Sequence, residues 1–379
     1  MRITFITPQP PEQFGGGGML IYAHLLALSH LLGSNNLLYF GPESKSVAIA
    51  SLVKEVYYVP QSSNVEKVKA VMTQRNYTAL GIHYEQNKQE IVKMIKEFSD
   101  FVWVEFTKTG HLINDLHNAG CYIACYAHNC EPDYYMISER NIYNLFKPAI
   151  VANEKLSCSS AQVILGDDSY LDRMKQQYNS MTNYYHLPFY SFKDNFQLMK
   201  RKPTGINSII LSGSFAYGHS FETVKNILTA WRNIYTKDMY LCLCGSGMER
   251  LSPYLRDVSN LVIYNKPYDE YPIIQNAKVY LNPFSSSSGV LTRNLVAMAV
   301  GVPIVGLADS FKGYNVENRK DVIMCEQLEE SIHKAIEVIQ NPQLLEFLIG
   351  NIINTFNTTY SFSCGKKNIT SILQMLSTM

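Results

Sequence analysis

The segment SSSSGVLTRNLVAMAVGVPIVG, residues 285–306, decides the fold class of this chain. A loop rich in hydroxyl groups leads into an apolar helix pattern, and Gly301 ends that pattern as glycines commonly do. Pro303 then opens a short β-branched run at Ile304 and Val305. A helix that returns the chain to a buried strand is the repeating unit of α/β folds, so the segment predicts a parallel sheet covered by helices.

The same alternation extends along almost the whole chain on the N-terminal side of this segment and continues after it. In the first half we expect strands at residues 3–7, 37–40, 56–59, 79–83, 101–106, 122–127 and 163–165, with helices at 19–32, 89–98 and 169–177. In the second half we expect strands at residues 207–211, 239–244, 261–264, 279–282, 304–305 and 322–324, with a helix at 221–235. The predicted fold class is α/β.

Residues 179–204 separate the two alternating series. They mix Asn, Tyr, Lys and Pro without a clear period and end in a basic run at residues 200–203. We therefore expect an N-terminal Rossmann-like domain over residues 1–190, a C-terminal Rossmann-like domain over 205–355, and a last helix over 356–379 that packs back on the N-terminal domain. Two such domains with parallel sheets would face each other across a ligand cleft at their strand C-termini.

The composition of the 379 residues excludes several classes of protein. Hydrophobic residues make up 46% and charged residues 17%, which is the balance of a globular chain and excludes disorder. Because 33 Lys and Arg stand against 32 Asp and Glu, the formal charge is only +1, and we expect no nucleic-acid partner. The eight Cys lack the spacing of a metal site or a secreted mini-domain, so we expect reduced thiols.

The beginning of the chain, MRITFITPQPP, lacks the apolar core of a signal peptide. No apolar run approaches the ~20 residues of a membrane-spanning helix. We therefore expect a cytoplasmic protein. Lys93, Lys96 and Lys108 form a small basic group that would allow peripheral contact with anionic lipid at the inner membrane face, although three lysines are also an ordinary solvated surface.

Glycines follow several predicted strands. In FGGGG, residues 14–18, Gly16 and Gly17 would let the backbone approach a phosphate at the start of the next helix. The alternative is a flexible turn, and the spacing is not the GxGxxG of dinucleotide sites. Two strands of the second half end in SGS at residues 212–214, which includes Ser214, and in GSG at residues 245–247, which begins with Gly245. The glycines of these segments would let a nucleotide approach the sheet edge, although turns of this kind use glycine in any case.

The loop at residues 285–293 is a second candidate anion site. The hydroxyls of Ser287 and Ser288, the Gly289 backbone and the Arg293 guanidinium could converge on a diphosphate without any metal. The alternative is a surface loop with a solvated arginine.

A third cluster, YAHNCE at residues 126–131, ends a predicted strand in the first half. His128 offers a proton-transfer group and Glu131 a carboxylate at the edge where an α/β fold builds its cleft, so both are candidate catalytic residues. The alternative is a structural histidine.

Together these segments resemble family four of the GT-B glycosyltransferases, over most of the chain. Residues 287–306 and 312–317 look like the family segment G-T-R-x-K-x-x-E-A-M-A-x-G-x-P-V-V followed by E-G. Residues 209–215 are similar to the start of the family's donor domain, 241–247 to its L-x-G-x-G strand end, and 127–131 to its H-N-x-E.

The resemblance implies roles for particular residues. Arg293 matches the basic residue that neutralises the donor diphosphate, Gly289 the glycine that opens the loop, and Gly16 and Gly17 the glycines beside the phosphates and sugar. His128 matches the histidine near the reacting sugar.

The turn at residues 265–268, which contains Lys266, is similar to the segment that borders the nucleobase. One departure concerns the family glutamate that holds the donor ribose, because Val296 takes its place here and Ser288 stands near its acidic partner.

The implied function is metal-independent transfer of a sugar from a nucleoside diphosphate sugar to a hydroxyl of a glycan or lipid-linked glycan. The resemblance also implies that the anomeric configuration of the sugar is retained. No cofactor other than this donor substrate is expected. Loss of the family carboxylate at Val296 keeps a second class open, a catalytically inactive GT-B protein that binds a glycan or a partner. A nucleotide-sugar epimerase or phosphorylase on the same fold is a third alternative.

Overall fold

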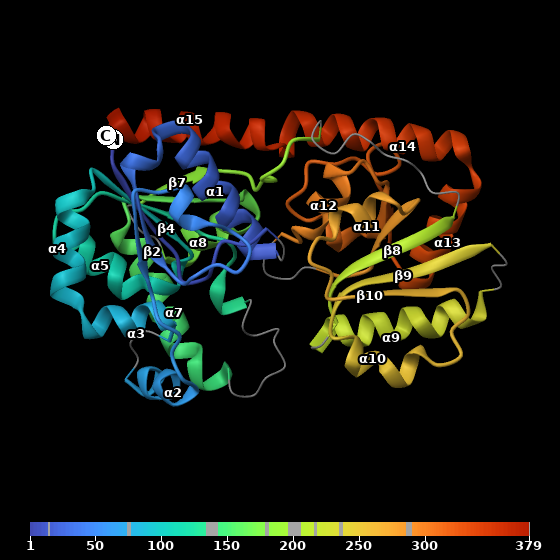
Figure 1. The fold of residues 1–379 in the computed structure, drawn as a ribbon, viewed down its shortest axis with the longest axis horizontal. Coiled ribbons are helices and arrows are strands. Elements are labelled where there is room, and N and C mark those ends of the chain that lie inside the picture. The colour runs from blue at the N-terminus through green and yellow to red at the C-terminus, as the bar shows by residue number, and fades with distance from the viewer. Residues whose placement is uncertain are drawn as a thin grey trace.

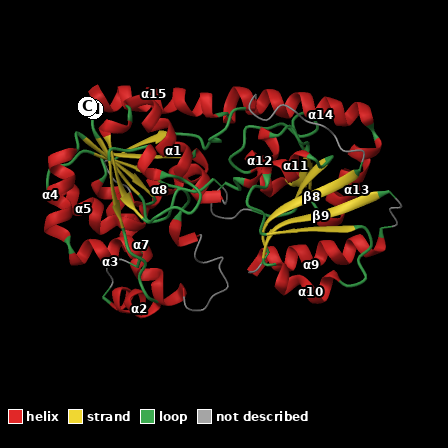
Figure 2. Cartoon of the chain, in the orientation of Figure 1, coloured by secondary structure: helices red, strands yellow, loops and turns green. Residues whose placement is uncertain are grey.

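The computed structural model describes residues 1–13, 16–73, 77–133, 143–178, 182–195, 206–215, 218–234, 238–285 and 290–378. The chain forms two lobes, each with a parallel sheet between layers of helices (Figures 1 and 2). We call residues 1–195 the N-terminal lobe and residues 206–355 the C-terminal lobe.

The N-terminal sheet has the order β3-β2-β1-β4-β5-β6-β7, and all its neighbouring strands pair in parallel. Its strands are β1 (Ile3–Ile6), β2 (Leu37–Gly41), β3 (Glu55–Tyr58), β4 (Phe101–Glu105), β5 (Ile123–Tyr126), β6 (Val163–Gly166) and β7 (Asn183–His186). Its helices are α1 (Gly16–Leu32), α2 (Asn64–Met72), α3 (Ala79–Gln86), α4 (Lys88–Phe98), α5 (Gly110–Asn118), α7 (Tyr143–Ser160) and α8 (Asp168–Tyr178).

The C-terminal sheet repeats this plan with the order β10-β9-β8-β11-β12-β13, again in parallel. Its strands are β8 (Asn207–Ser214), β9 (Met239–Ser246), β10 (Leu261–Asn265), β11 (Val279–Asn282), β12 (Ile304–Leu307) and β13 (Ile323–Cys325). Its helices are α9 (Gly218–Asn233), α10 (Met248–Leu255), α11 (Tyr271–Gln275), α12 (Arg293–Ala299), α13 (Leu328–Gln340) and α14 (Pro342–Thr355).

Alternate side chains along each strand point to opposite faces of the N-terminal sheet, and both faces are covered by helices. Phe5 packs in the cluster that contains α1, whereas Ile6 packs with Ile95 of α4 and Leu112 of α5. Because both faces are covered, the central strands are mostly apolar, which is the reason that their sequences are recognisable.

Two strand assignments differ from the sequence-based expectation. The strand predicted at residues 79–83 is wrong, because this segment is the helix α3. The Thr78 side chain caps it by accepting from the Gly81 N–H, and Leu80 and Tyr84, four residues apart, are buried on one side. The strand β7 lies within the stretch for which no element was predicted, since its partly exposed edge position requires no apolar run.

The last helix, α15 (Phe362–Thr378), lies along α1 of the N-terminal lobe, while α14 covers the C-terminal lobe (Figure 1). The ring of Phe362 meets His30 of α1 at 5.6 Å, and Gly365 lies against the Tyr190 ring. The Asn195 side-chain amide donates to the carbonyl of Ala299 at 2.7 Å and joins the lobes.

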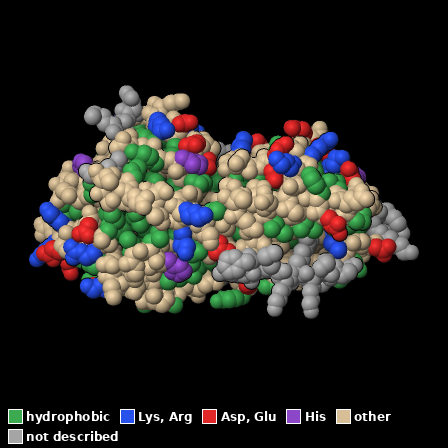
Figure 3. All heavy atoms as spheres, turned by 90° about the horizontal axis from the view of Figure 1, so that it is seen from above, with side chains coloured by type: hydrophobic (Ala, Val, Ile, Leu, Met, Phe, Trp, Pro, Cys, Tyr) green, Lys and Arg blue, Asp and Glu red, His purple; other side chains and the backbone are tan. Residues whose placement is uncertain are grey.

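In the described part of the chain, no helix combines the length and the apolar character needed to cross a bilayer. On the face seen in Figure 3, basic and acidic side chains are interspersed over both lobes. This mixture agrees with the near-neutral composition.

Candidate active site

A cleft of about 910 Å³ lies between the two lobes. Its walls come from the carboxyl ends of β4 and β5 on one side and of β8, β9 and β10 on the other, together with the start of α1 and residues 290–296. In each sheet the strand order reverses direction beside the first strand, at β1/β4 and at β8/β11, and open parallel sheets bind ligands at such points.

Two glycines form the floor of the cleft on the C-terminal side. Gly213 has φ 151° and Gly245 φ 140°, a backbone region that favours glycine. A Cβ at Gly213 would lie 2.9 Å from Nη1 of Arg293, and a Cβ at Gly245 would overlap the carbonyl of Gly213. The backbone is therefore left bare beside the guanidinium. Ser214, at the end of β8, is exposed and lines the same cleft.

Arg293 lines the cleft at the start of α12. Its Nη1 donates to the carbonyl of Ser212 at 3.2 Å, and its Cζ lies 4.2 Å from the centre of the Phe284 ring. Burial lowers the pKa of Arg293 from its usual value, and the neighbouring Tyr280 and Glu270 oppose this effect. Because its aromatic and carbonyl contacts orient the guanidinium, the cleft has a fixed cation on its C-terminal wall.

Glu270 lines the same wall, and the sequence did not indicate it. Burial raises the pKa of Glu270, whereas a hydrogen bond with Ser212 and the charge of Arg293 lower it. The hydroxyl of Ser212 also lies 3.0 Å from that of Tyr280. A carboxylate therefore stands beside the cation at the strand ends, near Val296, which lines the cleft with an apolar side chain.

The turn after β10 forms the outer rim of the C-terminal wall. Lys266, with φ 49°, lines the cleft and pairs with Glu249 at 2.9 Å, and both side chains are well exposed. Tyr268 lines the cleft with 74% of its surface exposed. The rim therefore offers a second cation and an aromatic face.

Gly16 and Gly17 form the first turn of α1 in the N-terminal lobe. Gly17 lines the cleft, and a Cβ at this position would lie 3.4 Å from Oε1 of Gln9 and 3.6 Å from Cζ of Phe106. These are ordinary contact distances, and it is the lack of a side chain in the cleft lining that lets the backbone of α1 approach a ligand here.

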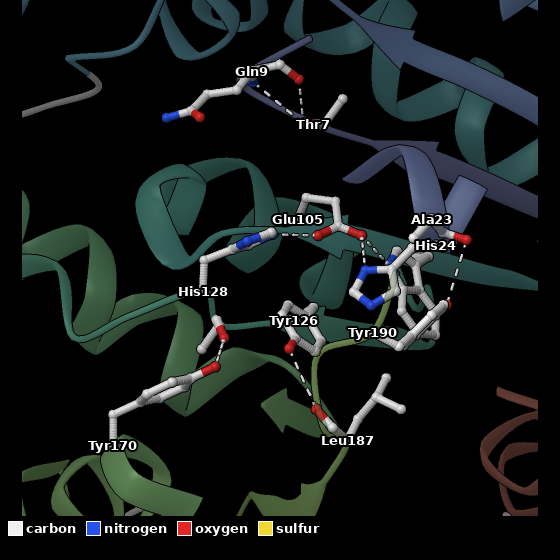
Figure 4. A network of polar contacts seen from close by, with 12 residues as sticks. Thr7, Gln9, Ala23, His24, Glu105, Tyr126, His128, Tyr170, Leu187 and Tyr190 are labelled. Atoms are coloured by element: carbon white, nitrogen blue, oxygen red, sulfur yellow. Dashed lines mark hydrogen bonds and ion pairs between the residues drawn. The ribbon is translucent and has the colours of Figure 1, made fainter. Parts of the chain in front are cut away.

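His128 lines the cleft from the loop after β5, opposite Arg293. Its Nε2 lies 2.6 Å from Oε2 of Glu105, the last residue of β4 (Figure 4). Oε1 of Glu105 lies 2.8 Å from Nδ1 of His24 on α1 and accepts from Nε1 of Trp103 at 2.7 Å. Burial alone would raise the pKa of Glu105, but His24 and His128 outweigh it and bring this pKa to about 2.

Glu131 lies behind this wall and is not among the side chains that line the cleft. It is 1% exposed and forms an ion pair with Lys108 at 3.5 Å. Lys108 does line the cleft, and its ammonium lies 4.4 Å from the centre of the Phe106 ring. Burial raises the pKa of Glu131 to about 7, although Lys108 favours the charged form.

The cleft thus brings together Gly17, Ser214, Gly245, Lys266, Arg293 and His128. Ser287, Ser288 and Gly289 lie outside the described residues. The sequence-based prediction missed Glu105, His24 and Glu270. A single acid at the end of the apolar run FVWVEF was the available signal for Glu105, since an unpaired carboxylate is costly in a buried strand.

A scan against protein-family models finds no matching family, and a search of curated proteins finds no relative in sequence. Solved structures are similar in fold. Sucrose-phosphate synthase from Thermosynechococcus elongatus has a TM-score of 0.72 at 11% identity, with 100% of both chains covered. WaaG, a glycosyltransferase involved in lipopolysaccharide biosynthesis, has a TM-score of 0.70 at 15% identity, with 96% of this chain and 98% of that chain covered.

HepE of Anabaena, solved in complex with UDP-glucose, has a TM-score of 0.69 at 10% identity, and the match covers 99% of this chain and 100% of that chain. These similarities extend over both lobes. The chain therefore has the GT-B fold, two Rossmann-like lobes that face each other across a cleft. The predicted α/β class and GT-B architecture are confirmed.

Proposed function

We propose that this protein is a glycosyltransferase that moves a sugar from a nucleoside diphosphate sugar to an acceptor hydroxyl. The observation that carries the proposal is the C-terminal wall of the cleft, where the Arg293 guanidinium lies beside the bare backbone of Gly213 and Gly245. A diphosphate needs a fixed cation and close backbone approach, and this wall has both. The similarity in fold to HepE, which was solved with UDP-glucose, also supports a nucleoside diphosphate sugar as the donor.

Charge develops on the leaving phosphate when the bond to the sugar breaks. Arg293 is held by Ser212 and Phe284, so it needs little reorganisation to stabilise this charge. Lys266 at the rim would add a second, more exposed cation. Because Arg293 and Lys266 place two side-chain cations on the C-terminal wall, we propose a metal-independent reaction with no further cofactor, in which the anomeric configuration is retained.

The donor sugar would lie toward the N-terminal wall, where His128 and Gly17 meet the cleft. We propose that His128 binds the sugar, whereas the leaving phosphate takes the acceptor proton. Glu131 lies behind the wall and pairs with Lys108, which lines the cleft, so Glu131 would act on the cleft only through that lysine. The acceptor would be a hydroxyl of a glycan, free or lipid-linked, and contact with a membrane would be peripheral.

The test is incubation of the protein with UDP-, GDP- and dTDP-sugars, with release of the nucleoside diphosphate as the readout. We expect turnover of at least one donor, and its loss in Arg293→Gln and His128→Ala. Arg250→Gln, a change of an exposed arginine outside the cleft, serves as the control. Unchanged turnover in both cleft variants would overturn the assignment of these residues, and the anomer of the product, read by proton NMR, tests retention.

Val296 favours a second candidate, a GT-B protein that binds a glycan or a partner without catalysis. This side chain lines the cleft where the family resemblance places a ribose-binding carboxylate. Hydrogen bonds to such a charged group contribute roughly 1.5–3 kcal/mol each, and valine makes none. Indifference to every nucleoside diphosphate sugar in the same assay, and in thermal unfolding, would favour this candidate.

A further inference from the structure

Three side-chain nitrogen atoms converge on one carboxylate beneath the N-terminal wall. Glu105 is fully buried, and its two oxygens face Trp103, His24 and His128 at distances of 2.6–2.8 Å. His24 and His128 approach it from opposite sides (Figure 4). Through Glu105, His24 and His128, these contacts join the end of β4 to α1 and to the loop after β5. The three segments are separate in sequence, and all border the cleft.

The charge on Glu105 determines what its partners donate. An ionised carboxylate only accepts hydrogen bonds, so each nitrogen that faces it has to carry the proton. His128 must therefore donate from Nε2. Only its other ring nitrogen, Nδ1, remains for a ligand in the cleft.

The position of the His128 ring is fixed from a second direction. The Phe106 ring stacks on it with centroids 3.8 Å apart and an interplanar angle of 16°. Phe106 itself adopts φ 66° and ψ 146°, a region that residues other than glycine rarely occupy. Strain of this kind persists only where the surroundings hold it, here directly after Glu105.

We propose that Glu105 is a positioning residue that fixes His128 as the Nε2–H tautomer, so that the cleft presents bare Nδ1 as a hydrogen-bond acceptor for a substrate hydroxyl. The inference rests on the proposed function for the identity of the hydroxyl, but the tautomer itself does not. Burial lowers the pKa of His128, which favours the neutral ring; Glu105 opposes this shift, and His24 and Lys108 add to it. A neutral ring with bare Nδ1 accepts from a hydroxyl and gives no hydrogen bond to an oxyanion.

The decisive measurement uses the unmodified chain with ¹⁵N-labelled histidine. Long-range proton–nitrogen NMR at pH 8 distinguishes a bare ring nitrogen from a protonated one, and comparison with His128→Gln assigns the His128 signals. We expect Nδ1 bare and Nε2 protonated. The opposite tautomer, or rapid exchange between the two, would overturn the proposal. Because no turnover is needed, this result is independent of the proposed function.

Glu105→Gln tests the consequence for the reaction. An amide oxygen accepts from fewer N–H groups than a carboxylate, so His128 should lose its single tautomer. With the donor sugar that the wild type uses, we expect kcat to fall roughly 10- to 100-fold. Affinity for the corresponding nucleoside diphosphate alone, measured by calorimetry, should change by less than about twofold, since this ligand lacks the sugar. An equal loss of both would show a merely structural role and overturn the positioning role.

Monodeoxy and monofluoro donor sugars test the direction of the hydrogen bond. A fluorine accepts weakly and donates nothing, so at the hydroxyl that faces His128 both replacements should reduce kcat/KM to the same extent. A fluoro sugar that retains the activity lost by the deoxy sugar would mean that His128 donates, which contradicts the proposal. If Glu105→Gln fails to fold, Trp103→Phe is the second variant. It removes one donor to Glu105 but keeps the carboxylate, so the His128 tautomer should stay unchanged, and loss of the single tautomer in this variant would contradict the proposal.

Discussion

Gly245 lies against Gly213 so closely that a Cβ at Gly245 would overlap the Gly213 carbonyl oxygen. The two residues are register partners in β9 and β8, and this contact sets the floor of the cleft. Gly245→Ala should therefore displace β9 from β8 as well as strain φ at 140°. We expect the free energy of unfolding to fall by roughly 2–5 kcal/mol.

Gly350→Ala is the matched control for this substitution. Gly350 lies on α14, and a Cβ there would meet nothing within 4 Å. Alanine favours a helix over glycine, so this variant should gain about 0.5–1 kcal/mol. Urea unfolding of the two variants and the wild type checks both signs, and equal stability of the Gly245→Ala protein would refute the close contact.

Tyr268 offers the aromatic face at the rim of the cleft. If a nucleobase stacks on it, Tyr268→Ala should remove about 1–3 kcal/mol of binding, whereas Tyr268→Phe should keep it. Tyr264→Ala provides a control, because this tyrosine lies in β10 outside the cleft lining. Calorimetry with UDP, GDP and dTDP measures the effect. Equal nucleotide affinity of the Tyr268→Ala protein and the wild type would show that the nucleobase does not stack on Tyr268.

Glu131 should make the stability of the protein depend on pH. Burial raises its pKa to about 7 in the folded state from 4.5 in the absence of burial. Between these values the folded chain holds a proton that the unfolded chain releases, so the free energy of unfolding falls as the pH rises from 4.5 to 7 and then levels off. The loss is on the order of 3 kcal/mol.

Urea unfolding from pH 4.5 to 8 measures this dependence in the wild type and in Glu131→Gln. The fall across the window should be smaller in the variant by the amount that Glu131 contributes. Glu97→Gln, which changes a well-exposed carboxylate on α4, should leave the curve as it is. Parallel curves for the wild type and the Glu131 variant would contradict the raised pKa.

Local patterns predicted most of the fold, because a strand covered on both faces is largely an apolar run, as in the first four residues of β4. They failed where burial is partial. The short segment at α3 has two apolar residues at helical spacing beside a glycine, and a strand was the wrong prediction for it. β7 has exposed ends and lies at the sheet edge, so its sequence carries little strand signal.

The residues of the candidate site likewise fall into those that the sequence could predict and those that it could not. Arg293 and His128 follow strands within recognisable segments, so their place at the cleft edge could be predicted. His24 and Glu105 are 81 residues apart, and they meet only because β1 and β4 are neighbours in the sheet while α1 covers one face. No local pattern contains that relationship. The role of Glu270 depends likewise on the approach of the turn after β10 to Ser212.

The central claim is that the cleft binds a nucleoside diphosphate through Arg293. Calorimetric titration of the wild type, Arg293→Gln and Arg250→Gln with UDP, GDP and dTDP tests it most directly. The account predicts one site for at least one of these ligands, an affinity at least about tenfold weaker in Arg293→Gln, equivalent to about 1.4 kcal/mol, and no change in Arg250→Gln. Binding of none of the three ligands, or equal binding by the two arginine variants, would contradict it.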